Sequence, residues 1–160
     1  MKRVSFLTKL YKEKKLQFVE PNENVKTAYI QRSEESLSSA KALLKIGNLR
    51  DSVSLAYYSM YHCLLALLFR IGVKCENHAA AIILLAKVFG KDNRSISKAK
   101  NERVDKQYYV DFKITEKEAE DSIVIAEEFI TDIRDFIEKL NHEDITLYQK
   151  KAHDVVSGYA

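Results

Sequence analysis

The chain has 160 residues, of which 46% are hydrophobic and 31% are charged. This length and composition suit one globular domain with a buried core and exclude an intrinsically disordered chain. A formal net charge of +3 is too small by itself to indicate a nucleic-acid partner. The longest apolar run, residues 63–69, is too short to cross a membrane, so no membrane contact is expected.

The chain has two cysteines, Cys63 within an apolar helical pattern and Cys75 in an expected loop. Two cysteines do not make a disulfide framework, and without a cluster of histidines they do not indicate zinc. Neither a metal nor a cofactor is therefore expected. Residues 1–15 are basic but lack the apolar segment of a signal peptide, so a cytoplasmic location is predicted.

Residues 1–21 are predicted to form a basic amphipathic N-terminal extension. Apolar side chains recur there at helical spacing until Pro21 interrupts the pattern. We expect this segment to pack on the main body or on a neighbouring subunit. Its six basic residues up to Lys15, against Glu13 alone, favour an acidic partner, and the alternative is a solvated helix face.

The pattern of residues 22–46 predicts a long helix, with Asn22 or Asn24 as its cap and Gly47 at its end. From about Arg50 to Gly72 a wide apolar stripe predicts the next helix. Because the stripe is so broad, we expect this helix to lie at the centre of a bundle.

A third helix is predicted after Asn77 and ends at Gly90, and the basic region that follows continues into a fourth helix. Thr115 and Glu118 have capping-box spacing and begin a last long helix that extends to Leu140. No strand pattern of useful length is evident. The prediction is an all-α fold, an up-and-down bundle of four to five helices over residues 22–141, followed by a polar tail, residues 142–160, of weak helical tendency.

Two histidines lie near apolar segments. His62 is on an apolar helix, where a lone histidine is most simply a hydrogen-bonded core residue. His78 begins a helix and is most simply a surface or near-cap residue. Tyr57, Tyr58 and Tyr61 are interpreted as core or interface aromatic residues whose hydroxyl groups reach a polar edge.

Four segments, taken in order, resemble the HEPN-domain family. They are AYYSMYHCLLALLFRIG at residues 56–72, the helix-opening His78, ERVDKQYY at residues 102–109, and ITEKEAEDSIVIAEEFITDI at residues 114–133. The resemblance extends from about Val25 to Leu140. It implies a helical bundle that forms a homodimer, with the arginine motifs of both subunits at one cleft. Many relatives are metal-independent ribonucleases that act as toxins and pair with a minimal nucleotidyltransferase.

The ribonuclease motif of that family is an arginine, four to six residues, and then a histidine. Arg103 matches the first position, but Tyr108 stands five positions later and no histidine follows in the window. An arginine suits the negative charge on a phosphate, and a histidine suits proton transfer near pH 7. Tyrosine, with a pKa of about 10, is a poor general base, so whether the protein is an enzyme stays open.

Three interpretations of this region remain. It is a cleft that binds RNA or a nucleotide, a nuclease with a substituted proton-transfer group, or a purely structural helix end in which Arg103 forms an ion pair. The alternative to an RNA-binding or RNA-cleaving toxin is a non-enzymatic nucleotide-binding or protein-interaction module. The candidate catalytic residues are Arg103 and Tyr108, and the candidate nucleotide- or RNA-binding residues are Lys98, Lys100, Lys106 and Tyr109.

Overall fold

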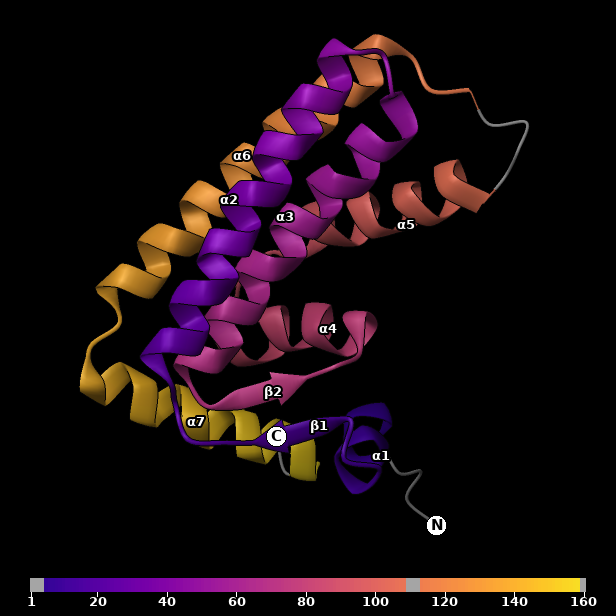
Figure 1. The fold of residues 1–160 in the computed structure, drawn as a ribbon. Coiled ribbons are helices and arrows are strands. Elements are labelled where there is room, and N and C mark those ends of the chain that lie inside the picture. The colour runs from indigo at the N-terminus through magenta and orange to yellow at the C-terminus, as the bar shows by residue number, and fades with distance from the viewer. Residues whose placement is uncertain (1–4, 109–112, 159–160) are drawn as a thin grey trace.

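A computed structural model describes residues 5–108 and 113–158, without the side chains of residues 104–108. The all-α prediction is confirmed, because helices make up most of the described residues (Figure 1). The helices are α1 Phe6–Lys12, α2 Glu23–Lys45, α3 Leu49–Arg70, α4 His78–Phe89, α5 Arg94–Tyr108, α6 Glu116–Lys139 and α7 His142–Ser157. Two short strands, β1 Leu16–Phe18 and β2 Val73–Cys75, complete the described elements.

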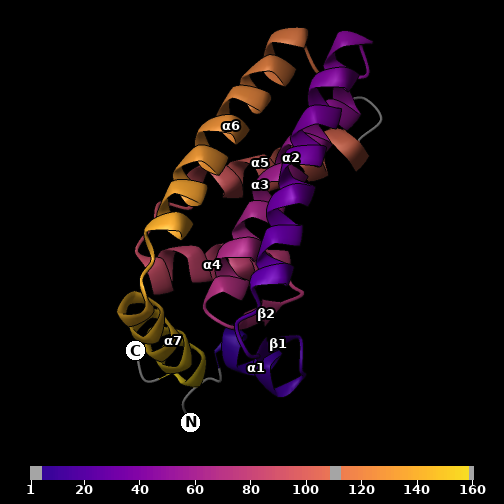
Figure 2. The same ribbon diagram turned by 60° about the vertical axis from the view of Figure 1, so that its left-hand side comes forward.

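Three long helices, α2, α3 and α6, lie side by side, while α4 and α5 cross α3 (Figures 1 and 2). The α2 helix runs in one direction, and α3 and α6 run in the other. The α3 helix is apolar on almost every side, so it packs against all the other long helices. Its largest fully buried side chains are Tyr57, Met60, Leu64, Leu67 and Leu68.

Small side chains allow α2 and α3 to approach each other closely. Ser33 of α2 is fully buried, and its hydroxyl group donates a hydrogen bond to the backbone oxygen of Ser59 at 2.6 Å. In the other direction, Ser52 of α3 donates to the backbone oxygen of Ala40 at 2.8 Å. Each buried hydroxyl therefore has a backbone acceptor, which offsets the cost of its removal from water.

The helix ends follow the predicted signals. Asn22, Asn77 and Thr115 each accept a hydrogen bond from a backbone N–H in the first turn of α2, α4 and α6. Gly90 ends α4 with φ of 65°, in the left-handed region that glycine adopts without strain. These local signals fix where each helix begins and ends.

The two strands form an antiparallel ribbon, in which Leu16 pairs with Cys75 and Phe18 pairs with Val73. The sequence did not predict this ribbon, because three-residue strands are too short to produce a readable alternation. Gly72 precedes β2 with φ of 77°, and a Cβ atom there would lie 2.3 Å from the backbone oxygen of Val19. The ribbon therefore requires glycine at this position.

The two terminal segments pack together at one end of the bundle (Figure 1). The polar tail forms a complete helix, α7, which begins with a capping box between Asn141 and Asp144. Leu7 and Leu10 of α1 are buried, and the side chain of Thr8 donates a hydrogen bond to the backbone oxygen of Val156 at 2.5 Å. The tail is more regular than predicted because α1 and α4 cover its apolar face.

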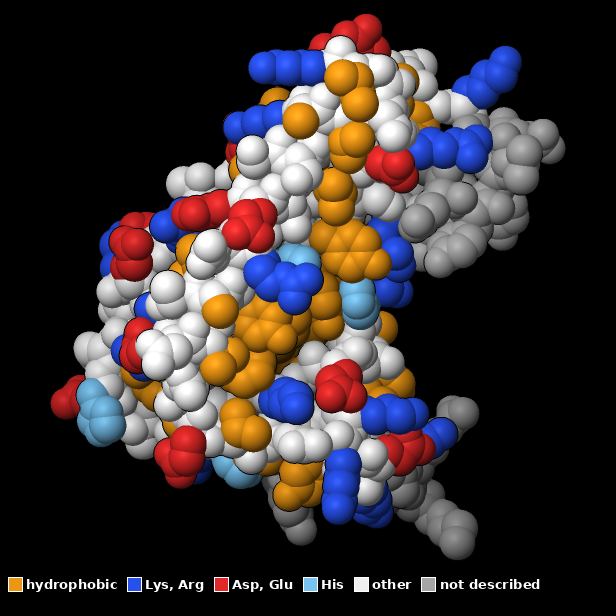
Figure 3. Space-filling view, in the orientation of Figure 1, with side chains coloured by type: hydrophobic (Ala, Val, Ile, Leu, Met, Phe, Trp, Pro, Cys, Tyr) orange, Lys and Arg blue, Asp and Glu red, His pale blue; other side chains and the backbone are white. Residues whose placement is uncertain are grey.

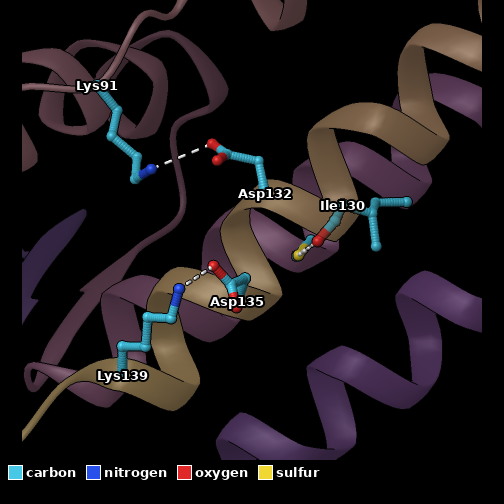
Figure 4. Close-up of polar contacts among 6 residues, drawn as sticks. Lys91, Ile130, Asp132, Asp135 and Lys139 are labelled. Carbon is cyan, nitrogen blue, oxygen red and sulfur yellow. Dashed lines mark hydrogen bonds and ion pairs between the residues drawn. The ribbon is translucent and has the colours of Figure 1, made fainter.

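Polar contacts hold α6 to its surroundings (Figure 4). The Nζ atom of Lys91, just after α4, lies 3.1 Å from a carboxylate oxygen of Asp132 on α6. The ion pair between Lys139 and Asp135, at 2.8 Å, lies within α6 itself. On the buried side, Sγ of Cys63 lies 3.9 Å from the backbone oxygen of Ile130. Burial raises the pKa of the Cys63 thiol to about 12, so this sulfur is unreactive at neutral pH.

Among the described helices, α3 alone is long and apolar enough to cross a membrane. However, 78% of its most apolar window is buried within the protein. This is the environment of the core helix of a soluble protein.

Candidate functional site

The tyrosines of α3 hold a histidine from the start of α4. The hydroxyl group of Tyr57 lies 2.7 Å from Nδ1 of His78, and the ring of Tyr61 stacks on the imidazole with a centroid distance of 3.8 Å. The edge of the same imidazole meets the Tyr58 ring, with centroids 6.2 Å apart. His78 directly follows the N-cap residue Asn77, as predicted for a near-cap residue. It is more than a surface residue, because three tyrosines also fix its ring.

Arg103 of α5 reaches the same tyrosines from another direction. Its Nη1 atom donates a hydrogen bond to the hydroxyl group of Tyr58 at 3.1 Å. The guanidinium carbon lies 5.4 Å from the ring centre of Tyr57 and 5.2 Å from that of Tyr58, within the range of cation–π attraction. We refer to Tyr57, Tyr58, Tyr61, His78 and Arg103 as the Arg103 cluster.

The Arg103 cluster keeps its histidine and its buried tyrosines uncharged at neutral pH. Burial, followed by the positive charges of Arg103 and Lys100, lowers the pKa of His78. Burial raises the pKa of Tyr57 and that of Tyr61. The cluster therefore combines one permanent cation with neutral hydrogen-bonding groups.

His62 extends the cluster toward α2. Its ring centre lies 6.0 Å from that of Tyr58 and 6.2 Å from that of Tyr29. Burial, Arg32 and His78 together lower its pKa to about 4. Its Nδ1 atom is buried, and no residue in the described part of the chain forms a hydrogen bond with it. His62 therefore differs from the hydrogen-bonded core histidine expected from the sequence.

A pocket of about 320 Å³ lies beside this ring system on α2. Tyr29 forms part of its wall and stacks on Phe69, with ring centres 5.4 Å apart. Figure 3 shows hydrophobic, histidine and basic side chains gathered in the middle of this face, where the surface is hollowed between α5 and β2. The pocket is lined by Asn22, Asn24, Val25, Ala28, Tyr29 and Arg32.

Comparison with protein families identifies the chain. The model of the HEPN domain matches residues 26–136, which include α3, α4, α5 and all of the Arg103 cluster. The chain belongs to the HEPN family. The resemblance of the four sequence segments is thereby confirmed.

Two archaeal relatives of this HEPN protein are similar in sequence. A Methanocaldococcus jannaschii protein named "Putative toxin MJ0605" is 34% identical over 120 residues, which are 71% of this chain and 89% of the relative. A Pyrococcus horikoshii protein named "UPF0332 protein PH1297" is 50% identical over 54 residues, which are 34% of this chain and 38% of that protein.

In this HEPN domain, the structure brings only some of the predicted site residues together. Arg103 lies in the cluster, and the charge of Lys100 acts on His78. Lys98 is exposed and pairs instead with Glu102, at 3.9 Å. Tyr108 is the last residue of α5. The side chains of Lys106 and Tyr108, and the whole of Tyr109, lie outside the described part of the chain.

The HEPN site also contains residues that the sequence did not single out for this role. Tyr58 binds Arg103, whereas the sequence indicated only an aromatic residue whose hydroxyl group reaches a polar edge. His78 was singled out only through the family resemblance, as the histidine that opens a helix. A further signal was the density of aromatic residues in YYSMYH, residues 57–62.

Proposed function

We propose that this HEPN protein is a toxin-type protein that binds RNA through the Arg103 cluster. The observation that carries the proposal is the position of Arg103, which two tyrosine rings and the Tyr58 hydroxyl group hold at a partly exposed edge of the fold. A planar guanidinium fixed in this way is suited to a phosphate, because it presents several N–H donors and retains its charge.

The surroundings of Arg103 favour a nucleic acid over a small anion. Partly buried rings lead from Tyr58 through His62 to Tyr29, and the pocket beside Tyr29 carries Arg32. Exposed aromatic faces next to cationic side chains are the features by which proteins bind single-stranded RNA, since bases stack on the rings and phosphates pair with the cations.

The further parts of the proposal come from the family and from a relative. The name of the Methanocaldococcus relative contains the word toxin, which supports a role in a toxin–antitoxin module. We propose a cytoplasmic homodimer in which the two Arg103 clusters face one cleft, with a minimal nucleotidyltransferase as the second component. Sedimentation of the purified protein tests the dimer, and a monomer at all concentrations would contradict it.

Titration of a fluorescently labelled, single-stranded oligoribonucleotide at one fixed salt concentration tests RNA binding. Arg103→Ala is expected to weaken binding by about ten- to a hundredfold, because a charged hydrogen bond contributes about 1.5–3 kcal/mol. Arg94→Ala is the matched control, since Arg94 lies on the same helix, is exposed, and pairs with Asp92. In Arg94→Ala the RNA affinity should fall only slightly, because the variant loses one positive charge and no specific contact.

Equal losses of RNA affinity in the two variants would mean that net charge alone attracts the RNA. This result would contradict a specific site. No RNA binding by the parent protein would exclude the proposal, and calorimetry with mononucleotides would then test the alternative nucleotide-binding module. Cleavage is measured separately, with EDTA present. RNA cutting that Arg103→Ala abolishes would add ribonuclease activity to binding.

A further inference from the structure

The hydrogen bond between Tyr57 and His78 determines which imidazole nitrogen carries a proton. Tyr57 is fully buried, with 0% of its surface exposed, so its hydroxyl proton needs an acceptor. Nδ1 of His78, at 2.7 Å, is the acceptor within reach among the described residues. Because burial raises the pKa of Tyr57, the phenol keeps its proton, and its O–H group donates a hydrogen bond to Nδ1.

The protonation of Nε2 follows from that of Nδ1. Burial, Arg103 and Lys100 lower the pKa of His78, so the imidazole is neutral at pH 7. A neutral imidazole has one N–H group and one acceptor nitrogen. Since Nδ1 accepts from Tyr57, the hydrogen resides on Nε2, and Nε2 acts as a donor.

Three aromatic side chains hold this donor in place. Tyr61 stacks on the imidazole, Tyr58 meets it edge-on, and Tyr57 fixes its rotation. Arg103 contacts two of the same tyrosines. His78 remains partly exposed. His78 and Arg103 thus contact the same two tyrosines, Tyr57 and Tyr58, and both are partly exposed. An oxyanion is the ligand that can accept hydrogen bonds from an imidazole N–H and a guanidinium together.

We propose that His78 is a phosphate-binding residue whose Nε2–H donates a hydrogen bond to the RNA phosphate bound by Arg103. This inference rests on the proposed function, because it assigns a second donor to the same site. It also gives His78 a binding role distinct from the proton transfer that the histidine of the ribonuclease motif performs. Tyr57 is a positioning residue that fixes the Nε2–H form.

Imidazole nitrogen NMR of the parent protein tests the tautomer without any RNA. The spectrum is expected to show His78 as the Nε2–H form at pH 7. Addition of inorganic phosphate should shift this N–H signal, and should shift it much less in Arg103→Ala. An Nδ1–H form would overturn the proposal. An unchanged spectrum at high phosphate concentration would also overturn it.

RNA titration of four variants then tests the donor itself. His78→Ala is expected to weaken binding about tenfold or more, because a hydrogen bond to a charged phosphate is lost. In His78→Gln, an amide N–H takes the place of Nε2–H, so it should restore most of the affinity. Tyr57→Phe should weaken binding about threefold, whereas Tyr11→Phe, at an exposed tyrosine of α1 outside the Arg103 cluster, should not. Circular dichroism confirms that each variant is folded.

The results separate the two proposals. If Arg103→Ala weakens RNA binding but His78→Ala and His78→Gln bind alike, the assignment of His78 fails and the Arg103 site stands. If Arg103→Ala leaves RNA affinity unchanged, the proposed function fails. The phosphate-dependent shift of the His78 signal then decides by itself whether the histidine binds oxyanions.

Discussion

The α3 helix carries two polar regions of opposite character. On its α2 side, Ser52 and Ser59 are completely buried, and their hydroxyl groups donate hydrogen bonds to backbone oxygens. At the Arg103 cluster, Tyr58 and His78 are partly exposed and interact with other side chains. The first region contains small groups that cannot ionise near neutral pH, whereas the second includes Tyr57, Tyr61 and His78, whose pKa values are shifted by burial.

Under the proposed function, this difference separates stability from RNA binding along one helix. A hydroxyl group bound to a backbone oxygen has no donor left for a ligand. A side chain held by other side chains keeps one face available, because its partners occupy only part of its hydrogen-bonding capacity. Substitutions in the core or at the serine contacts should therefore change stability and leave RNA binding intact, and substitutions at the partly exposed Tyr58, His78 and Arg103 should do the reverse.

The largest expected effect comes from the centre of α3. Leu64 is fully buried, so Leu64→Ala should lower the free energy of unfolding by about 2–5 kcal/mol, because a cavity remains. Urea denaturation measures the loss. Val124→Ala is the matched control, since Val124 on α6 is 51% exposed and should lose far less. The RNA affinity of the folded Leu64 variant should stay unchanged. A parallel loss of affinity would contradict the separation of stability from RNA binding.

A smaller effect on a different property is expected at the α2 pocket. Tyr29→Ala should weaken RNA binding by about 1–3 kcal/mol, which is the contribution of stacking one base on an aromatic ring. Tyr29→Phe keeps the ring and should bind like the parent. Titration with the labelled RNA measures both. If the phenylalanine variant lost as much affinity as the alanine variant, the proposal that a base stacks on this ring would be wrong.

A buried hydroxyl group should contribute less than a leucine side chain. Ser33→Ala removes one hydrogen bond to the backbone oxygen of Ser59 and should cost about 1 kcal/mol in the free energy of unfolding. Ser39, exposed on the same helix, gives the control variant Ser39→Ala. Urea denaturation should separate the two variants, and RNA binding should be equal in both. Equal stability of the two variants would remove the proposed structural role.

The last expected effect is a dependence of stability on pH. The pKa of His62 is about 4 in the folded protein, below the ordinary value of 6.5. Between these values the unfolded chain binds more protons, so the stability present above about pH 6.5 is lost as the pH falls toward 4. In His62→Gln this part of the loss should disappear. Urea midpoints at several pH values measure it, with the exposed His142→Gln as the control.

The sequence by itself determined the ends of the long bundle helices and the family. Asn22, Asn77, Thr115 and Gly90 mark helix ends through hydrogen bonds and backbone angles that span only a few residues. Such signals are local, so they can be recognised without knowledge of the rest of the fold. The breadth of the apolar stripe also identified α3 as the central helix, because a helix that is apolar on most sides must be covered.

Only the tertiary structure decided which side chains meet. Arg103 and Tyr58 are 45 positions apart, and Tyr57 and His78 are 21 apart. Their contacts depend on how α4 and α5 cross α3, and no local pattern encodes those crossings. For the same reason the three-residue strands were missed, and α7 was predicted only as a weak helical tendency. Short or weakly helical segments become ordered when other elements pack against them.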